Sequence, residues 1–169
     1  MPWKKYLILF LLTIYGGVAM AFTISSTAFK NNEMISNQYT CDGQDKSPAL
    51  MWSNVPEGTK SFVLICDDPD APNGTWVHWV LFNIPTTVIS LEENIQHFPE
   101  NVKQGNNSWN RTGYGGPCPP SGTHRYFFKL YALDTMLNLP EGSNKSTIET
   151  AMKNHVLEQA SLIGKYARN

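Results

Sequence analysis

Residues 125–133 read RYFFKLYAL and form the longest β-rich run of the chain. Successive side chains of a strand point to opposite faces, which places Tyr126 and Phe128 on one face. The other face carries Phe127 and Tyr131, so both faces hold bulky side chains. A strand with bulk on both faces needs cover on each side, and we therefore expect it to lie inside a two-layer structure.

Short β-rich runs separated by Gly, Pro, Asn and Asp clusters dominate the first two thirds of the chain, with Ser61–Cys66 and His78–Ile84 as the clearest strands. Helical periodicity occurs only near the C-terminus, after a capping box that runs from Ser146 to Glu149. We therefore predict a helix over Ser146–Tyr166. The expected fold is mainly β: a two-layer antiparallel β-sandwich with a peripheral C-terminal helix.

The N-terminal segment has the pattern of a secretory signal. Lys4 and Lys5 precede an apolar run, and Ala19-Met20-Ala21 supplies a small-x-small cleavage site. The alternative is a membrane anchor, but the apolar stretch from Tyr6 to Met20 has 15 residues with two glycines, against about 20 for a spanning helix. We therefore predict a leader at residues 1–21, no permanent membrane anchor, and a periplasmic or secreted protein of residues 22–169.

Length and charge limit the function further. Removing the predicted leader, residues 1–21, from the 169-residue chain leaves residues 22–169, which are enough for one domain with a hydrophobic core. The whole chain has 13 basic and 14 acidic side chains, and removing the two leader lysines makes the net charge −3. This balance argues against a nucleic-acid partner, which requires a clustered basic surface.

Three cysteines in an oxidising compartment permit at most one internal disulfide. Cys66 ends the apolar run Phe62–Ile65, whereas Cys41 and Cys118 lie in loops rich in Gly, Pro and Asp. We predict a Cys41–Cys118 disulfide and leave open whether Cys66 stays free. Three free thiols are the alternative.

Three polar clusters interrupt the apolar strands. The first, Asp67–Pro72, places three carboxylates after a buried strand, where prolines stiffen the turn. The second is Trp76-Val77-His78-Trp79, where regular alternation puts Trp76 and His78 on one face and Val77 and Trp79 on the other. The alternative for the first cluster is an acidic loop without a role in binding. The alternative for the second is that His78 is a buried structural residue.

The third cluster is the Gly- and Pro-rich loop Gly113–Thr123, which leads into His124 and Tyr126 on one strand face. Each histidine alone is more often structural. Two strands that each present a histidine two residues from an aromatic side chain indicate a shared cavity.

These three motifs, in this order, closely resemble the signatures of the phosphatidylethanolamine-binding family, which includes Raf kinase inhibitor protein. Its bacterial branch looks nearest, because Cys-Asp-Gly at Cys41–Gly43 and Gly-Pro-Cys-Pro-Pro at 116–120 are similar to that branch. The resemblance runs from about Phe22 to Tyr166. It implies a β-sandwich with an anion pocket.

Matching the family motifs onto this chain assigns the pocket lining residue by residue. The resemblance implies these lining residues: Asp68, Asp70, Trp76, His78, Pro120, His124 and Tyr126. No residue of the C-terminal helix is carried over, because its sequence differs from that of the animal members; for His155 a structural role is expected.

The expected function is binding of a small anionic or zwitterionic ligand, such as phosphate or a phosphoethanolamine headgroup. An aspartate that pairs with a histidine raises the pKa of the imidazole and fixes its tautomer, so that an N–H faces the ligand. Tyr126 either donates its hydroxyl or completes an apolar wall. No cofactor is expected.

Two other functions stay open. One is a hydrolase using two aspartates and two histidines, although compact metal-ligand spacings, a Gly-x-Ser-x-Gly elbow and phosphate-binding glycine motifs are absent from the sequence. The other is an inhibitor or signalling protein that acts on an enzyme through its surface. In a purely structural interpretation, the His–Asp pairs only hold loops together.

Overall fold

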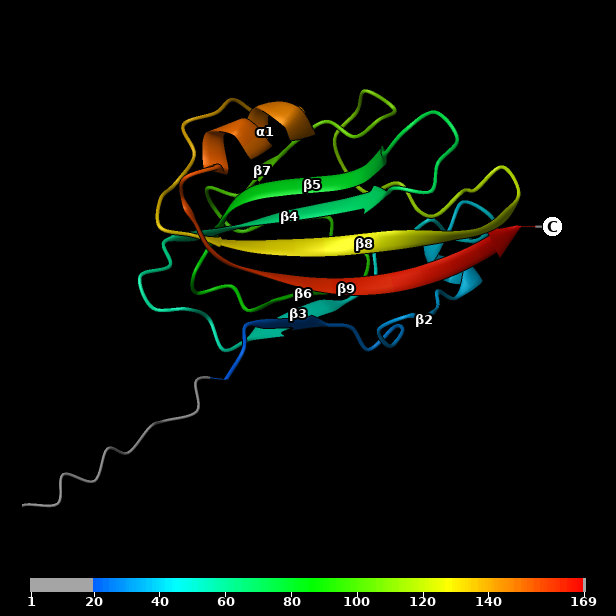
Figure 1. The fold of residues 1–169 in the computed structure, drawn as a ribbon, viewed down its shortest axis with the longest axis horizontal. Helices are drawn as coiled ribbons and strands as arrows, with labels where there is room; N and C mark the ends of the chain where they lie inside the picture. The colour runs from blue at the N-terminus through cyan, green and yellow to red at the C-terminus, as the bar shows by residue number, and fades with distance from the viewer. Residues whose placement is uncertain (1–19, 169) are drawn as a thin grey trace, which may run out of the picture.

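The computed structural model describes residues 20–168, and in this range two sheets pack face to face (Figure 1). The large sheet has the strand order β2-β9-β8-β4-β5-β7, and the small sheet has the order β1-β3-β6. The elements are β1 (Thr23–Ser25), β2 (Glu33–Met34), the short 3₁₀ helix η1 (Asn37–Tyr39), β3 (Leu50–Ser53), β4 (Ser61–Asp68), β5 (Trp76–Pro85), β6 (Ser90–Leu91), β7 (Lys103–Gln104), β8 (Gly122–Leu133), α1 (Lys145–Met152) and β9 (Val156–Arg168).

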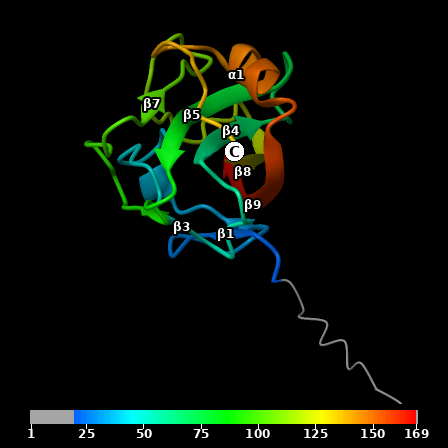
Figure 2. The same cartoon turned by 90° about the vertical axis from the view of Figure 1, so that its left-hand side faces the viewer.

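Strand β8 lies in the middle of the large sheet, paired antiparallel with β4 and β9. Tyr126, Phe128 and Leu130 point into the core between the two sheets. Tyr131 and Leu133 belong to a second cluster, with Ile148 and Met152 of α1. The small sheet thus covers one face of the large sheet and α1 covers the other (Figure 2). The predicted two-layer β-sandwich and its peripheral helix are confirmed.

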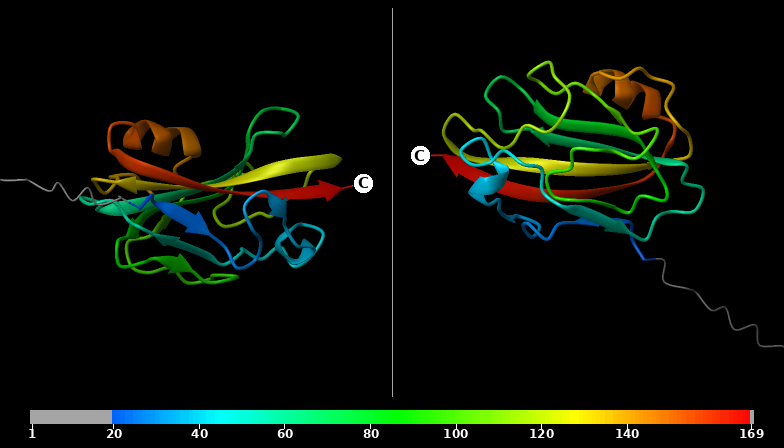
Figure 3. Two further views of the ribbon diagram at one scale, coloured as in Figure 1. Left: turned by 60° about the horizontal axis from the view of Figure 1, so that its bottom comes forward. Right: turned by 180° about the vertical axis from the view of Figure 1, so that it is seen from behind.

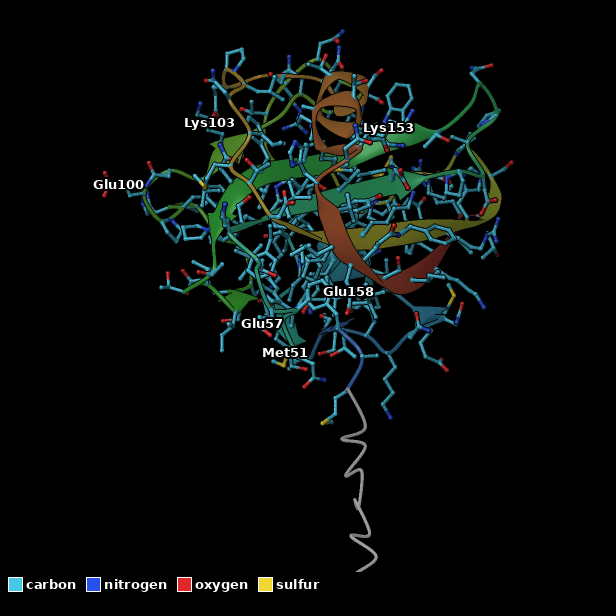
Figure 4. The ribbon with its side chains drawn as sticks, turned by 60° about the vertical axis from the view of Figure 1, so that its left-hand side comes forward. Met51, Glu57, Glu100, Lys103, Lys153 and Glu158 are labelled. Carbon is cyan, nitrogen blue, oxygen red and sulfur yellow. A yellow bond between two sulfur atoms is a disulfide. The ribbon has the colours of Figure 1, made fainter. Side chains whose placement is uncertain are left out.

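Strand pairing is antiparallel between all named strands of the described region except β2 and β9, which run parallel with Glu33 opposite Gly164. Figure 3 shows α1 and the small sheet on opposite sides of the long strands. Charged side chains of both signs are spread over the surface, as the labelled Glu100, Lys103, Lys153 and Glu158 illustrate (Figure 4).

The predicted helix over Ser146–Tyr166 is wrong in its extent. The helix ends at Met152, and the chain then forms β9, which pairs with β8 along its whole length. Alternate residues of β9, among them Leu162 and Tyr166, point into the inter-sheet core. The apolar spacing after Val156 fits the period of a helix and also that of a strand. The open edge of β8 decides in favour of a strand, because its backbone groups need hydrogen-bond partners.

The helix start also differs from the expected capping box. Asn144 is the N-cap, and its Oδ1 accepts a hydrogen bond from the backbone N–H of Thr147 at 2.9 Å. His155 lies in the turn between α1 and β9, where its Nδ1 is 2.7 Å from Oδ1 of Asp134. Both side chains are partly exposed, so this pair closes a turn at the surface.

The predicted Cys41–Cys118 disulfide is present, with the two Cα atoms 5.5 Å apart. Cys66 is buried and free. The predicted leader, residues 1–21, lies almost wholly outside the described residues and stays a prediction. Between residues 20 and 168, none of the helices has the length and apolar character needed to cross a membrane.

Candidate functional site

A cavity of about 270 Å³ opens at the end of the large sheet where β4 finishes and β5 and β8 begin. Asp68, the last residue of β4, pairs with Trp76, the first residue of β5. His124 lies near the start of β8, where it pairs with Tyr166 of β9. The residues lining the cavity are Asp68, Ala71, Pro72, Asn73, Gly74, Trp76, His78, Trp109, Cys118, Pro119, Pro120 and His124.

A β-bulge directs His78 to this cavity. Cys66 pairs with Trp79 but Asp67 pairs with Val77, so His78 is an extra residue in β5. The expectation that Val77 and Trp79 share a face is therefore wrong: Trp79 lies in the inter-sheet core, whereas Val77 packs against the cluster beneath α1. The bulge lets His78 and Trp79 both lie on the inner side of the sheet.

The Asp68 carboxylate orients the His124 imidazole. Nδ1 of His124 lies 2.7 Å from Oδ2 of Asp68, and both side chains are almost fully buried. The other oxygen, Oδ1, accepts the backbone N–H of Asp70 at 2.8 Å. Because the carboxylate occupies Nδ1 of His124, Nε2 is the ring nitrogen left for a ligand.

A backbone carbonyl holds His78 in the same manner. Nδ1 of His78 is 2.6 Å from the carbonyl oxygen of Gly115, so Nδ1 donates and Nε2 is again the free ring nitrogen. Burial lowers the pKa of His78 below 6.5, which keeps the ring neutral near neutral pH. The ring stands edge-on to Tyr126 and Trp109, at centroid distances of 5.1 and 5.2 Å.

Trp109 is a wall residue that the sequence interpretation missed. Its ring meets Trp76 edge-to-face at 5.4 Å, and Asn107 holds its backbone by accepting the Trp109 N–H at 3.0 Å. Only glycine fits at position 115 of the adjoining loop, because a Cβ there would lie 2.5 Å from the Trp109 ring. The sequence did hold a signal for this wall residue, because Trp109 is the single large apolar side chain in the polar run 106–111.

Comparison of the chain with known proteins identifies its family. The family model described as phosphatidylethanolamine-binding protein matches residues 25–167. The chain belongs to the phosphatidylethanolamine-binding protein family. Membership implies an anion-binding pocket in general terms.

Similar proteins come from both bacteria and archaea. The UPF0098 proteins of Methanothermobacter thermautotrophicus and Aquifex aeolicus are each 51% identical, over 86% and 91% of this chain and 98% and 92% of their own. A crystal structure from Chlamydia trachomatis, described as a homologue of phosphatidylethanolamine-binding protein, has a TM-score of 0.83 at 39% identity and covers 88% of this chain and 99% of its own. Escherichia coli YbcL, described as a new member of the mammalian family, has a TM-score of 0.82 at 33% identity, with 88% and 99% coverage.

The structure brings most of the residues implied by the family motifs into one cavity. Asp68, Trp76, His78, Pro120 and His124 line it. Whether they bind a ligand stays a prediction. In residues 20–168 no group of three or more His, Cys, Asp and Glu side chains is arranged to hold a metal ion.

Asp70 and Tyr126 belong to the family motifs but are absent from the cavity lining. Tyr126 is fully buried beneath His78, and its hydroxyl has no hydrogen-bond partner in the described region. Asp70 forms a two-pronged ion pair with Arg125, at 2.8 Å to Nε and 2.7 Å to Nη2. These bonds lower the pKa of Asp70 from 3.8 to about 2. Tyr126 thus supports His78, and Asp70 ties the proline turn to β8.

We predict that Asp70→Asn lowers the free energy of unfolding by about 1 kcal/mol at about pH 7, since the pair is partly exposed. The folded-state pKa of Asp70 is depressed, so its contribution is complete above 3.8 and is lost as the pH falls toward about 2. Urea unfolding of both proteins across this range measures the difference. Arg125→Met should give the same loss, and the double variant no further loss. A difference that stays constant down to the lowest pH at which both proteins fold would contradict the prediction.

Proposed function

We propose that this protein is an exported ligand-binding protein whose cavity takes a small phosphate-bearing molecule, such as a phosphoethanolamine headgroup. The observation that carries the proposal is the pair of imidazoles in one cavity. His78 and His124 are each held through Nδ1, by Gly115 and by Asp68, which leaves both Nε2 atoms for a ligand.

A carboxylate beside an anion site is compatible with this role because its charge is already compensated. Both oxygens of Asp68 accept hydrogen bonds, one from His124 and one from the backbone of Asp70. A proton on Nε2 of His124 would then bond a phosphate oxygen, with Asp68 stabilising the imidazolium. The neutral Nε2 of His78 would accept a proton from a phosphate hydroxyl or bind an ammonium group.

The apolar side of the cavity suits the rest of a zwitterionic headgroup. Trp76 and Trp109 stand at right angles, and Pro120 adds an apolar wall without a backbone donor. A ligand ammonium group that rests on either indole face would gain cation–π attraction. Phosphate and ammonium groups would thus each find a different part of one small cavity.

Phosphoethanolamine titration tests the proposed ligand directly. We expect saturable shifts of the ligand phosphorus signal and of the protein amide signals, with the ligand intact, because the cavity holds the headgroup without attacking it. His124→Ala should weaken binding at least about tenfold, since it removes a charge-assisted hydrogen bond. The matched control is His155→Ala, which removes a histidine that also pairs with an aspartate but lies outside the cavity.

The other outcomes separate the competing functions. Release of inorganic phosphate would replace the proposal with a hydrolase. Equal binding by wild type and His124→Ala would remove the ligand from this cavity. If no phosphate ester binds, while a target enzyme is inhibited equally by both proteins, the protein acts through its surface.

The pH dependence of anion binding follows from the burial of His78. Because burial lowers the pKa of His78, a bound anion that draws a proton onto this ring must bind with proton uptake. We predict that sulfate, whose own charge is constant here, binds up to about tenfold more tightly per unit of pH as the pH falls from about 8 toward the lowered pKa of His78. Calorimetry in two buffers of different ionisation heat measures the uptake. Sulfate affinity independent of pH would contradict it.

Export is proposed from two features that support each other. The N-terminal segment reads as a cleavable leader, and the Cys41–Cys118 disulfide is typical of oxidising compartments. We expect the full chain, produced in a bacterium, to accumulate outside the cytoplasm with Phe22 as its first residue. After alkylation in denaturant, mass spectrometry should find one modified thiol, that of Cys66. A cytoplasmic protein beginning at Met1 with three modified thiols would contradict the prediction.

A further inference from the structure

A second cavity, of about 280 Å³, lies on the other side of the loop that carries Trp109 and shares no lining residue with the first. It is formed mainly by the loops that follow η1, β6 and β7. Side chains from three separated segments of the chain, around residues 45, 95 and 112, meet here. The family motifs assign no role to this place.

The second cavity is lined mainly by polar groups that still have free bonding capacity. Asp45 uses Oδ1 to accept the backbone N–H of Gly116, and within residues 20–168 its Oδ2 has no hydrogen-bond donor. Arg111 stacks on Trp109 with its guanidinium 5.8 Å from the ring centroid, and no carboxylate of residues 20–168 pairs with it. Gln104 contributes a side-chain amide, which offers both a donor and an acceptor.

One residue that lines this cavity has a buried donor without a partner. Trp79 lines it and is 1% exposed, yet its indole N–H has no hydrogen-bond partner in the part of the chain that the structure describes. The Trp79 ring packs edge-to-face on Tyr114, another lining residue, at 5.5 Å. A buried N–H without a partner costs free energy, and its NMR signal reports on the surroundings of the ring that lines this cavity.

We propose that this second cavity binds a neutral polyhydroxylated ligand of about one sugar ring. The cavity has one acidic and one basic side chain, so it favours no net charge. Gln96 Nε2 already donates to Asn94 Oδ1 at 3.0 Å, which leaves Gln96 Oε1 as an acceptor and Asn94 Nδ2 as a donor. Each ligand hydroxyl both donates and accepts, which matches these two groups and the amide of Gln104. The cavity is also smaller than the roughly 300–1,000 Å³ of drug-sized sites, which limits the ligand to one ring.

A zwitterionic amino acid fits the second cavity less well. It would depend on ion pairs with Asp45 and Arg111, which are both exposed to solvent, and exposed ion pairs contribute little. Hydroxyl ligands depend instead on the amides and on apolar contact of the ring with Phe98 or Tyr114. The side chains present therefore favour the sugar.

The indole N–H signals of the tryptophans make the test specific for one cavity. Purified protein with ¹⁵N-labelled tryptophan is titrated separately with glucose, galactose, N-acetylglucosamine and glycine. We expect at least one sugar to shift the Trp79 indole signal saturably, with a Kd on the order of 1 mM, while the signals of Trp52 and Trp76 stay in place. Trp79→Phe assigns the signal.

Two glutamine variants control the result. Gln104→Leu removes a lining amide and should weaken sugar binding at least about fivefold, with a dispersed amide spectrum as evidence of folding. Gln159→Leu changes an exposed glutamine on β9, outside the cavity, and should bind as wild type does. The proposal is overturned if none of the sugars shifts Trp79, if only glycine does, or if Gln104→Leu binds the sugar unchanged. Because the readout does not involve His124, it is independent of phosphoethanolamine binding.

Discussion

Strand β8 carries bulky side chains on both faces, and the layers of the molecule are arranged to cover them. The inner face packs against the small sheet through residues such as Phe128, and the outer face packs against α1 through Leu133. Burial of a strand on both sides also requires that its backbone groups be paired along both edges. Strands β4 and β9 meet this requirement, and the edge of β8 is the reason why residues 156–168 form a strand.

The same alternation separates two neighbouring carboxylates into different roles. Asp67 points to the α1 side, where it is fully buried and forms ion pairs with Lys129 and Lys145. Asp68 points to the inner side and orients His124. One carboxylate therefore ties the helix to the sheet, and the next one builds the cavity, because successive residues of a strand face opposite ways.

The loop between β7 and β8 forms a wall between the two cavities. Gly115 binds His78 on one side, while Tyr114 contacts Trp79 on the other. The loop holds its position because Gly116 lies too close to Tyr39 for any side chain and because Cys118 is linked to Cys41. The position of this one loop therefore shapes both cavities.

The sequence by itself determined the mainly β fold and the covered β8 strand, and it favoured the disulfide, while the resemblance of its motifs to the family supplied five lining residues of the first cavity. These features depend on local alternation and on ordered motifs, which a chain shows before it folds. Only the tertiary structure decided that the helix ends at Met152, that a bulge turns Trp79 into the core, and that Trp109 completes the wall while Asp70 pairs with Arg125. Each of these depends on a partner distant in the sequence, an open strand edge, an opposing register or a facing side chain, and such a partner is brought near only when the layers assemble.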